Sequence, residues 1–148
     1  MGGSVTLCSM LFIVLIGYWY GPKVGITAAI AYGFLQFILE PIFYTIPQML
    51  TDYPLAFGAL GISGFFCKKK HGLILGYIAG VLGRYFFAFL SGVIFFGAYA
   101  ADYNMAVPVY SLVYNGAYLL SEAAITLIII ALPPVQKALK HVKKSVTE

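Results

Sequence analysis

The sequence predicts an all-α membrane protein with five transmembrane helices. Composition is the first reason, because 61% of the 148 residues are hydrophobic and only 9% are charged, whereas soluble domains carry about 25% charged residues. The second reason is that apolar runs recur along nearly the whole chain. One transmembrane domain over residues 1–134 and a basic tail over residues 135–148 are therefore expected.

The expected spans follow from runs of roughly 20 mainly apolar residues. Their ranges are 4–20, 24–44, 52–66, 72–99 and 108–132. Pro41 should bend or end the second span, and the fifth should begin at Pro108 and end before Pro133, because proline suits a first helical turn but stops a helix that it follows. The third span is short, and the fourth is long enough to tilt. Closely spaced glycines in both predict tight helix packing.

The basic residues mark one side of the membrane. Lys23 joins the first two spans, Lys68–Lys70 join the third and fourth, and lysines fill the tail after the fifth. The other two connections lack lysine and arginine and hold Glu40, Asp52 and Asp102. The positive-inside rule therefore places the basic segments and the C-terminus in the cytoplasm. The N-terminus would then lie outside, so we expect that the native protein has a sixth helix before residue 1.

Sequence motifs speak against an enzyme, a metal site and a cofactor. The chain has no Walker A, HExxH, zinc-type or GxSxG pattern, so it has no means of hydrolysing ATP itself. Cys8 and Cys67 have neither disulfide-type nor metal-type spacing, and His71 and His141 belong to the basic segments. Those segments fit an anionic lipid surface, not nucleic acid.

A few polar side chains interrupt the apolar spans. They are Gln36, Asp52, Arg84, Asn115 and Glu122. Ionisable residues inside a membrane are rare, face the bundle interior and are functional candidates. Arg84 lies about 12 residues into the fourth span, which is roughly 18 Å at 1.5 Å per residue. That depth puts its guanidinium in the outer half of the bilayer.

The fifth span carries a polar and aromatic stripe that would face this region. Four of its members recur every four residues, and one more directly follows Tyr114, so they all lie on one helix face. The five are Tyr110, Tyr114, Asn115, Tyr118 and Glu122. An apolar helix that points such a stripe inward describes a pocket wall. An outward-facing pocket lined by tyrosines and phenylalanines is therefore predicted.

Structural roles are the alternatives for the same residues. Arg84 could lock helices together by pairing with an acidic residue. Asn115 could bond a neighbouring helix, and Tyr99 and Tyr103 could belong to the aromatic belt at the membrane interface.

Three stretches of this sequence resemble a known family, the thiamine-specific substrate-binding (S) component of energy-coupling factor transporters. They lie within residues 21–126 and include "DYPLAF", "GRYFFAFLSGVIFFGAYA" and "PVYSLVYNGAYLLSEAAIT". The resemblance implies a six-helix membrane bundle whose vitamin site opens outward. It starts at the family's second helix, in agreement with the expected sixth helix.

The resemblance also implies site roles at matching positions. These fall on Asp52, Tyr53, Arg84, Phe96, Tyr110 and Asn115, and Glu122 joins them from its place on the stripe. Where the family usually has Glu, His and Trp, this sequence has Asp52, Ala88 and Phe96. Phenylalanine keeps a stacking face but is a weaker cation–π partner than tryptophan.

The implied ligand is thiamine. Its thiazolium is a permanent cation, which suits the carboxylate of Asp52 or Glu122 and aromatic faces, while its aminopyrimidine suits stacking and the Asn115 amide. Arg84 would meet the hydroxyethyl arm and should contact a carboxylate, which would offset its charge beside a cationic ligand. The implied partners are a transmembrane coupling subunit and two ATPase subunits in a bacterial cytoplasmic membrane.

Two other classes of function stay open at this point. An ion-gradient-driven permease could relay protons through Arg84 and Glu122, and uptake without ATPase partners would favour it. A non-transporting membrane scaffold or a fragment is the other, and failure to bind any vitamin would favour that class.

Overall fold

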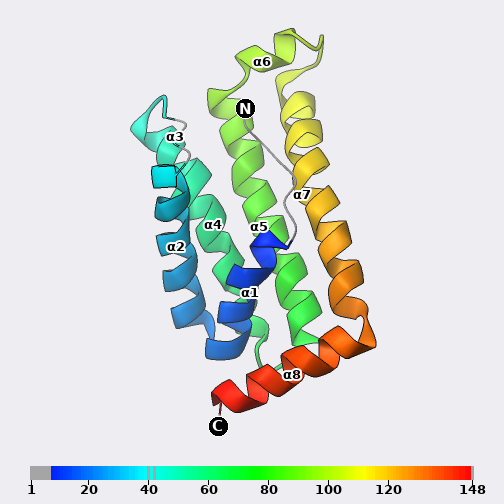
Figure 1. Cartoon of the computed structure of the whole chain (residues 1–148). Coiled ribbons are helices and arrows are strands. Elements are labelled where there is room, and N and C mark those ends of the chain that lie inside the picture. Colours follow the sequence, from blue (N-terminus) through cyan, green and yellow to red (C-terminus); the bar gives the residue numbers. More distant parts are fainter. Residues whose placement is uncertain (1–7, 40, 42, 148) are drawn as a thin grey trace.

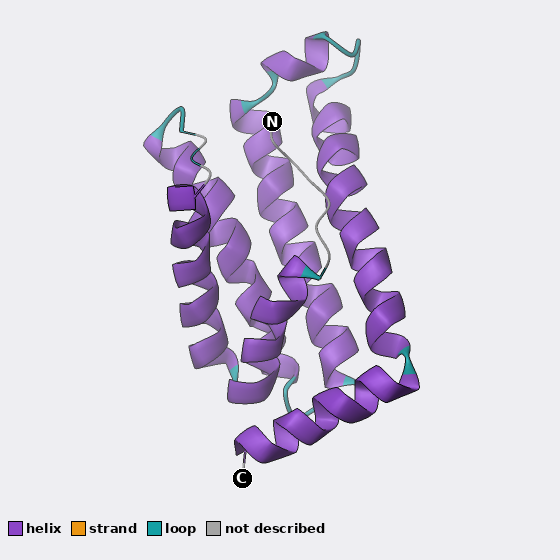
Figure 2. Cartoon of the chain, viewed as in Figure 1, coloured by secondary structure: helices purple, strands orange, loops and turns teal. Residues whose placement is uncertain are grey.

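The computed structural model describes residues 8–39, 41 and 43–147, and every regular element within these ranges is helical (Figures 1 and 2). The elements in chain order are α1 (Ser9–Tyr20), α2 (Pro22–Leu39), α3 (Ile46–Leu50), the π-helix η1 (Thr51–Leu55), α4 (Ala56–Gly58), the 3₁₀-helix η2 (Ala59–Phe66), α5 (Gly72–Phe95), α6 (Ala98–Ala101), α7 (Val107–Ala131) and α8 (Pro133–Thr147). The predicted all-α class is confirmed.

The long helices stand side by side as a bundle, and α8 lies across one end of it (Figure 1). Among the described residues, α2, α5 and α7 are long and apolar enough to cross a membrane, and α1 is a shorter apolar helix. The second, fourth and fifth predicted spans are thus confirmed. Helix α2 ends at Leu39, before Pro41, and α7 covers almost the whole predicted range.

The third predicted span is not one regular helix. Residues 51–66 form a π-helical turn, a short α-helical turn and a 3₁₀-helix in succession. Pro54 lies inside the π-helix, where it removes one backbone donor. Glycines in the 3₁₀-helix then let it approach its neighbours closely: a Cβ on Gly61 would lie 2.5 Å from the Cα of Ile26 in α2. The prediction of tight packing at these glycines is confirmed.

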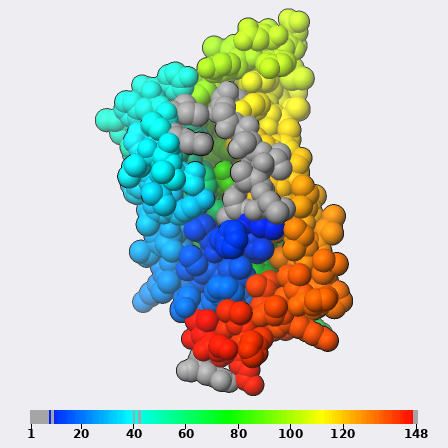
Figure 3. Space-filling model, in the orientation of Figure 1, coloured from blue at the N-terminus to red at the C-terminus, as the bar shows by residue number. Residues whose placement is uncertain are grey.

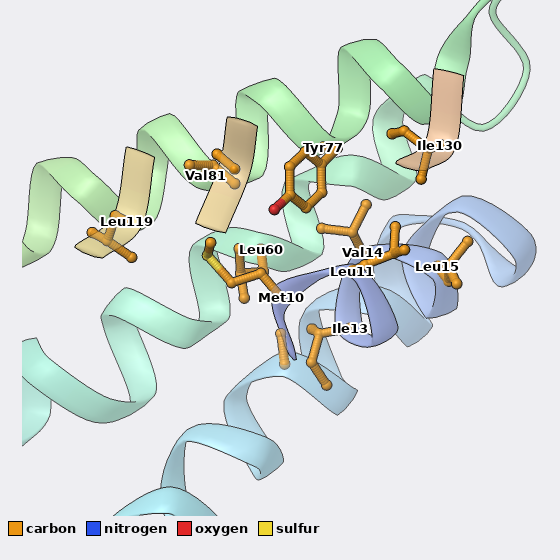
Figure 4. Close-up of a cluster of buried hydrophobic side chains, with 12 residues drawn as sticks. Met10, Leu11, Ile13, Val14, Leu15, Leu60, Tyr77, Val81, Leu119 and Ile130 are labelled. Carbon is orange, nitrogen blue, oxygen red and sulfur yellow. The ribbon is translucent and has the colours of Figure 1, made fainter. Parts of the chain in front are cut away.

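In the first predicted span, residues 4–20, the described helix α1 begins only at Ser9 and is therefore shorter than expected. Residues 1–7 lie outside the described ranges. Helix α1 occupies only the half of the bundle next to α8 (Figure 1). Its side chains fill the main core there, where Met10 and Val14 meet Leu60, Tyr77 and other buried residues (Figure 4). This core lies at the α8 end of the bundle.

Large apolar side chains cover the outside of the bundle. Ile38, Phe12 and Ile128 are each about two-thirds exposed or more, at 72%, 66% and 67%. In water such a surface would be unfavourable, but lipid tails satisfy it. The exposed apolar surface therefore agrees with a multi-pass membrane protein.

Candidate functional site

Most of the predicted site residues gather toward the end of the bundle opposite α8. Asp52 and Tyr53 lie in η1, Phe96 follows α5, and Tyr110 and Asn115 lie in the first half of α7. The elements α3 and α6 lie at this same end (Figure 1). The space-filling view shows the face between the cyan α2–α3 segment and the yellow part of α7 hollowed, with green atoms deep inside (Figure 3).

The carboxylate of Asp52 is held by a buried glutamine. The Nε2 of Gln48 donates a hydrogen bond of 2.5 Å to Asp52 Oδ2, and Gln48 Oε1 accepts one of 3.0 Å from the backbone N–H of Tyr44. Thr45 caps the N-terminus of α3, accepting from Gln48 N at 3.2 Å. This local cap fixes the short helix that aims Gln48 at the acid.

Ser91 approaches the same carboxylate from α5. Its side chain is only 1% exposed, and within the described part of the chain its Oγ has no hydrogen-bond partner of normal geometry. A hydroxyl in that position is free to bond either the acid or a ligand. Sequence reasoning missed both Gln48 and Ser91. The cap sequence that begins at Thr45 could have indicated the helix of Gln48, whereas no sequence signal marks Ser91.

The predicted contact between Arg84 and a carboxylate is absent among the described residues. The guanidinium carbon instead lies 4.3 Å from the ring centroid of Phe57, in a cation–π contact. The charge of Glu122 still acts on Arg84 through space. Neutral donors bind both acids instead: an amide binds Asp52, and a backbone N–H binds Glu122.

Glu122 caps the beginning of α1. Its side chain is 2% exposed, and its Oε1 accepts a hydrogen bond of 3.1 Å from the backbone N–H of Met10. The N-cap residue of α1, Cys8, makes no such side-chain bond. A carboxylate at a helix N-terminus satisfies an unpaired donor and complements the helix dipole. Glu122 therefore has a structural partner deep in the bundle, and its ligand role stays a prediction.

Asn115 bonds the neighbouring helix, as the structural alternative predicts. Its Nδ2 donates to the backbone carbonyl of Ala88 on α5 at 3.1 Å and to that of Ser111 at 2.9 Å, while its Oδ1 accepts from the hydroxyl of Tyr118 at 2.9 Å. Ser111 in turn donates to the carbonyl of Phe89 at 2.8 Å. A ligand that accepts from Nδ2 must replace one of these partners, whereas Oδ1 can accept a second hydrogen bond.

Aromatic rings line the same end of the bundle. Tyr103, Tyr110 and Tyr114 stack in sequence, with centroids 5.4 Å and 5.9 Å apart. On the other side of the site, the ring of Tyr53 meets Phe37 edge to face at 5.2 Å. Tyr103, expected in the interfacial belt, thus contacts a predicted site residue.

Phe96 and two tyrosines form a second aromatic group beside the α5–α6 connection. The ring of Phe96 is buried and lies 5.5 Å from that of Tyr44, edge to face. The hydroxyls of Tyr44 and Tyr99 are 3.4 Å apart, and this hydrogen bond, reinforced by the charge interaction between the two phenols, raises the pKa of Tyr99. Flat aromatic faces and one carboxylate suit a flat cation better than an anion.

Apolar spanning helices around a polar and aromatic recess define a membrane protein of the solute-transport class. Within the described ranges, no group of three or more His, Cys, Asp or Glu side chains could hold a metal ion. The family model described as "Thiamine transporter protein (Thia_YuaJ)" matches residues 1–142. The chain therefore belongs to this family of thiamine transporters, in agreement with the family resemblance and with the prediction that it is not an enzyme.

Individual relatives carry the same description. The thiamine transporter ThiT of Bacillus subtilis (strain 168) is 36% identical over 145 residues, which cover 88% of this chain and 74% of that protein. The ThiT of Lacticaseibacillus paracasei is 33% identical over 96 residues, 56% of this chain and 47% of that one. A solved structure of ThiT from Listeria monocytogenes matches with a TM-score of 0.78 at 27% identity, covering 99% of this chain and 85% of that chain.

Proposed function

We propose that this chain is the membrane substrate-binding component of a thiamine uptake system. The observation that carries the proposal is that a member of the thiamine transporter family brings a carboxylate, which forms no ion pair with a described residue, and several aromatic rings together at one end of its helix bundle. Asp52, Tyr53, Phe96 and Tyr110 are the residues concerned.

The chemistry of thiamine suits this arrangement. Its thiazolium ring cannot lose its charge, so a carboxylate within a partly dry site favours it over neutral compounds. Asp52 would supply that charge, and the faces of Phe96 and Tyr110 would stack on the flat rings. Asn115 would bond the aminopyrimidine by exchanging a protein partner, and Arg84 would meet the hydroxyethyl arm. Glu122, deeper in the bundle, would add a second negative charge.

The proposal includes an orientation in the membrane and a set of partners. Lys68–Lys70 and α8 lie at the same end of the bundle, and Lys143 of α8 donates to the carbonyl of Cys67. The positive-inside rule supports a cytoplasmic location for this end in a bacterial cytoplasmic membrane, and so an outward-facing site. Because the sequence has no ATP-hydrolysing motif, a coupling subunit and two ATPase subunits would supply the energy.

Calorimetry of the purified protein with thiamine is the direct test of the binding role. We expect saturable binding of thiamine and weaker binding of its separate pyrimidine and thiazolium halves, because each half makes only part of the contacts. Absence of any heat with thiamine would refute the proposal.

Uptake into vesicles tests the partners. Thiamine uptake that requires co-expressed coupling and ATPase subunits agrees with the proposal. Uptake by this chain alone, collapsed by dissipating an ion gradient, would instead favour the permease.

A further inference from the structure

A second recess lies at the other end of the bundle, far from the thiamine site. Its volume is about 250 Å³, and it lies between the turn at Lys69–Lys70, the first turn of α5 and the inner side of α8. That volume is below the roughly 300–1,000 Å³ of typical small-molecule pockets, so it suits a small chemical group and not a whole cofactor.

The rim of this recess is strongly basic. The side chains of Lys69, Lys70, His71 and Lys140 line it, and none of the described lining residues is acidic. Two of these lysines come from the α5 side and one from α8, so the positive charges approach the recess from both walls. Lysines on both walls of one small recess give it a positive potential that favours an anion between them.

The backbone adds to the attraction for an anion. Helix α5 begins at Gly72, and its N-cap residue, His71, makes no side-chain hydrogen bond to it. The first turn of this long helix, including Leu73 and Ile74, lines the recess. The N–H of Gly72 donates to the carbonyl of Lys69 at 3.0 Å. The next N–H groups of a first turn have no partner within the helix and carry the positive end of its dipole.

The floor of the recess is apolar. Tyr18, Ile130 and Leu139 join the leucine and isoleucine of the α5 turn beneath the basic rim. Lys143 fixes one wall, because its Nζ lies 3.9 Å from the Tyr18 ring centroid and donates to the carbonyl of Cys67. A basic rim over an apolar floor matches an amphiphile that has an anionic head, rather than a free ion.

We propose that this recess binds the phosphate of an anionic phospholipid from the surrounding membrane. The phosphate would lie between Lys70 and Lys140 at the α5 N-terminus, and the glycerol and upper acyl region would cover the apolar floor. Basic pockets between helices on the cytoplasmic side are suited to anionic head groups. The bound lipid would join α8 to α5 without any contact to the thiamine site.

Native mass spectrometry of the full chain in neutral detergent provides the test, with phosphatidylglycerol as the probe. The double variant Lys70→Gln/Lys140→Gln should bind this lipid about 25-fold more weakly, because each lysine near an anionic head group raises the affinity about fivefold. The matched control Lys68→Gln/Lys137→Gln makes the same charge change in the same two segments, outside the recess. It should bind within about twofold of the parent chain, since exposed charges outside a site are screened.

Three results would overturn the proposal. The first is an equal loss of phosphatidylglycerol binding in both double variants, and the second is that the parent chain binds phosphatidylcholine as well as phosphatidylglycerol. The third is displacement of the lipid by inorganic phosphate or glycerol phosphate, which would assign the recess to a soluble phosphate ester. Circular dichroism checks that both variants stay helical. If the test variant does not fold, hydrogen exchange of the unmodified chain decides: phosphatidylglycerol, unlike phosphatidylcholine, should slow exchange in the first turn of α5 and in α8, and no slowing would refute the proposal.

Discussion

Replacing Asp52 by asparagine isolates the charge that the proposed site offers to thiamine. The change removes one negative charge but keeps an oxygen that can accept the hydrogen bond from Gln48, so the short helix before it should stay in place. At a separation of about 4–5 Å and an effective dielectric constant of about 20, a carboxylate and a permanent cation attract by about 3–4 kcal/mol. Dehydration of both groups offsets part of that energy. A net loss of about 2 kcal/mol, or roughly 30-fold in Kd, is expected.

Calorimetry should compare thiamine with an isosteric analogue in which a neutral thiophene replaces the thiazolium. The parent chain should prefer thiamine, and Asp52→Asn should remove most of that preference while changing the affinity for the neutral analogue by less than about threefold. Asp102→Asn is the matched control, because Asp102 is exposed in the connection between α6 and α7. Its exposed charge is screened by salt, so this variant should bind thiamine nearly like the parent.

The pattern across ligands decides the test. Equal losses for thiamine and for the thiophene analogue would show that Asp52 shapes the site without acting through its charge. An equal effect of Asp102→Asn would mean that general surface potential attracts the vitamin. Either result would refute the assigned role of Asp52.

Three further predictions concern packing and anchoring. Gly61→Ala, whose Cβ would lie 2.5 Å from the Cα of Ile26, should lower the Tm in detergent by roughly 3–10 °C, whereas Gly58→Ala meets only a flexible side chain and should change it little; equal Tm values would contradict the packing argument. Glu122→Ala should destabilise the protein by about 1–3 kcal/mol and Glu122→Gln by less, because glutamine still caps α1; equal losses would show that charge, not capping, matters. Lys143→Met should speed amide exchange in α8 about tenfold, and unchanged exchange would show that this lysine does not anchor the helix.

The spans that could be predicted from the sequence are those whose stability is local. Helices α5 and α7 are long apolar runs, and prolines mark both ends of α7, so sequence and structure agree within a few residues except that α5 ends before residue 99. The segment after Asp52 could not be predicted as a broken helix. Its mixture of π and 3₁₀ turns follows from Pro54 and from glycines that pack against α2, and tertiary contacts of that kind leave no periodic signal.

The residues of the site were predictable by type but their partners were not. A polar side chain in an apolar helix is conspicuous in the sequence, which is why Asn115 and Glu122 could be found. Which groups bond them depends on how helices meet: Asn115 reaches the carbonyl of Ala88, and Glu122 reaches the start of α1 more than a hundred residues away in the chain. Gln48 escaped notice because it lies in a short helix between the predicted spans.

Arg84 and Asp52 have different partners, and this explains how the proposed site could hold both an arginine and a cationic vitamin. If Arg84 were paired with Asp52, the two charges would cancel and a thiazolium would gain little. Instead, Arg84 lies over Phe57, and Asp52 is held by the neutral amide of Gln48. An amide supports a carboxylate without neutralising it, so the negative charge of Asp52 remains available to a positively charged ligand. In the proposed site, the guanidinium would stay over the Phe57 ring and meet the uncharged hydroxyl of the ligand, while Asp52 meets the thiazolium.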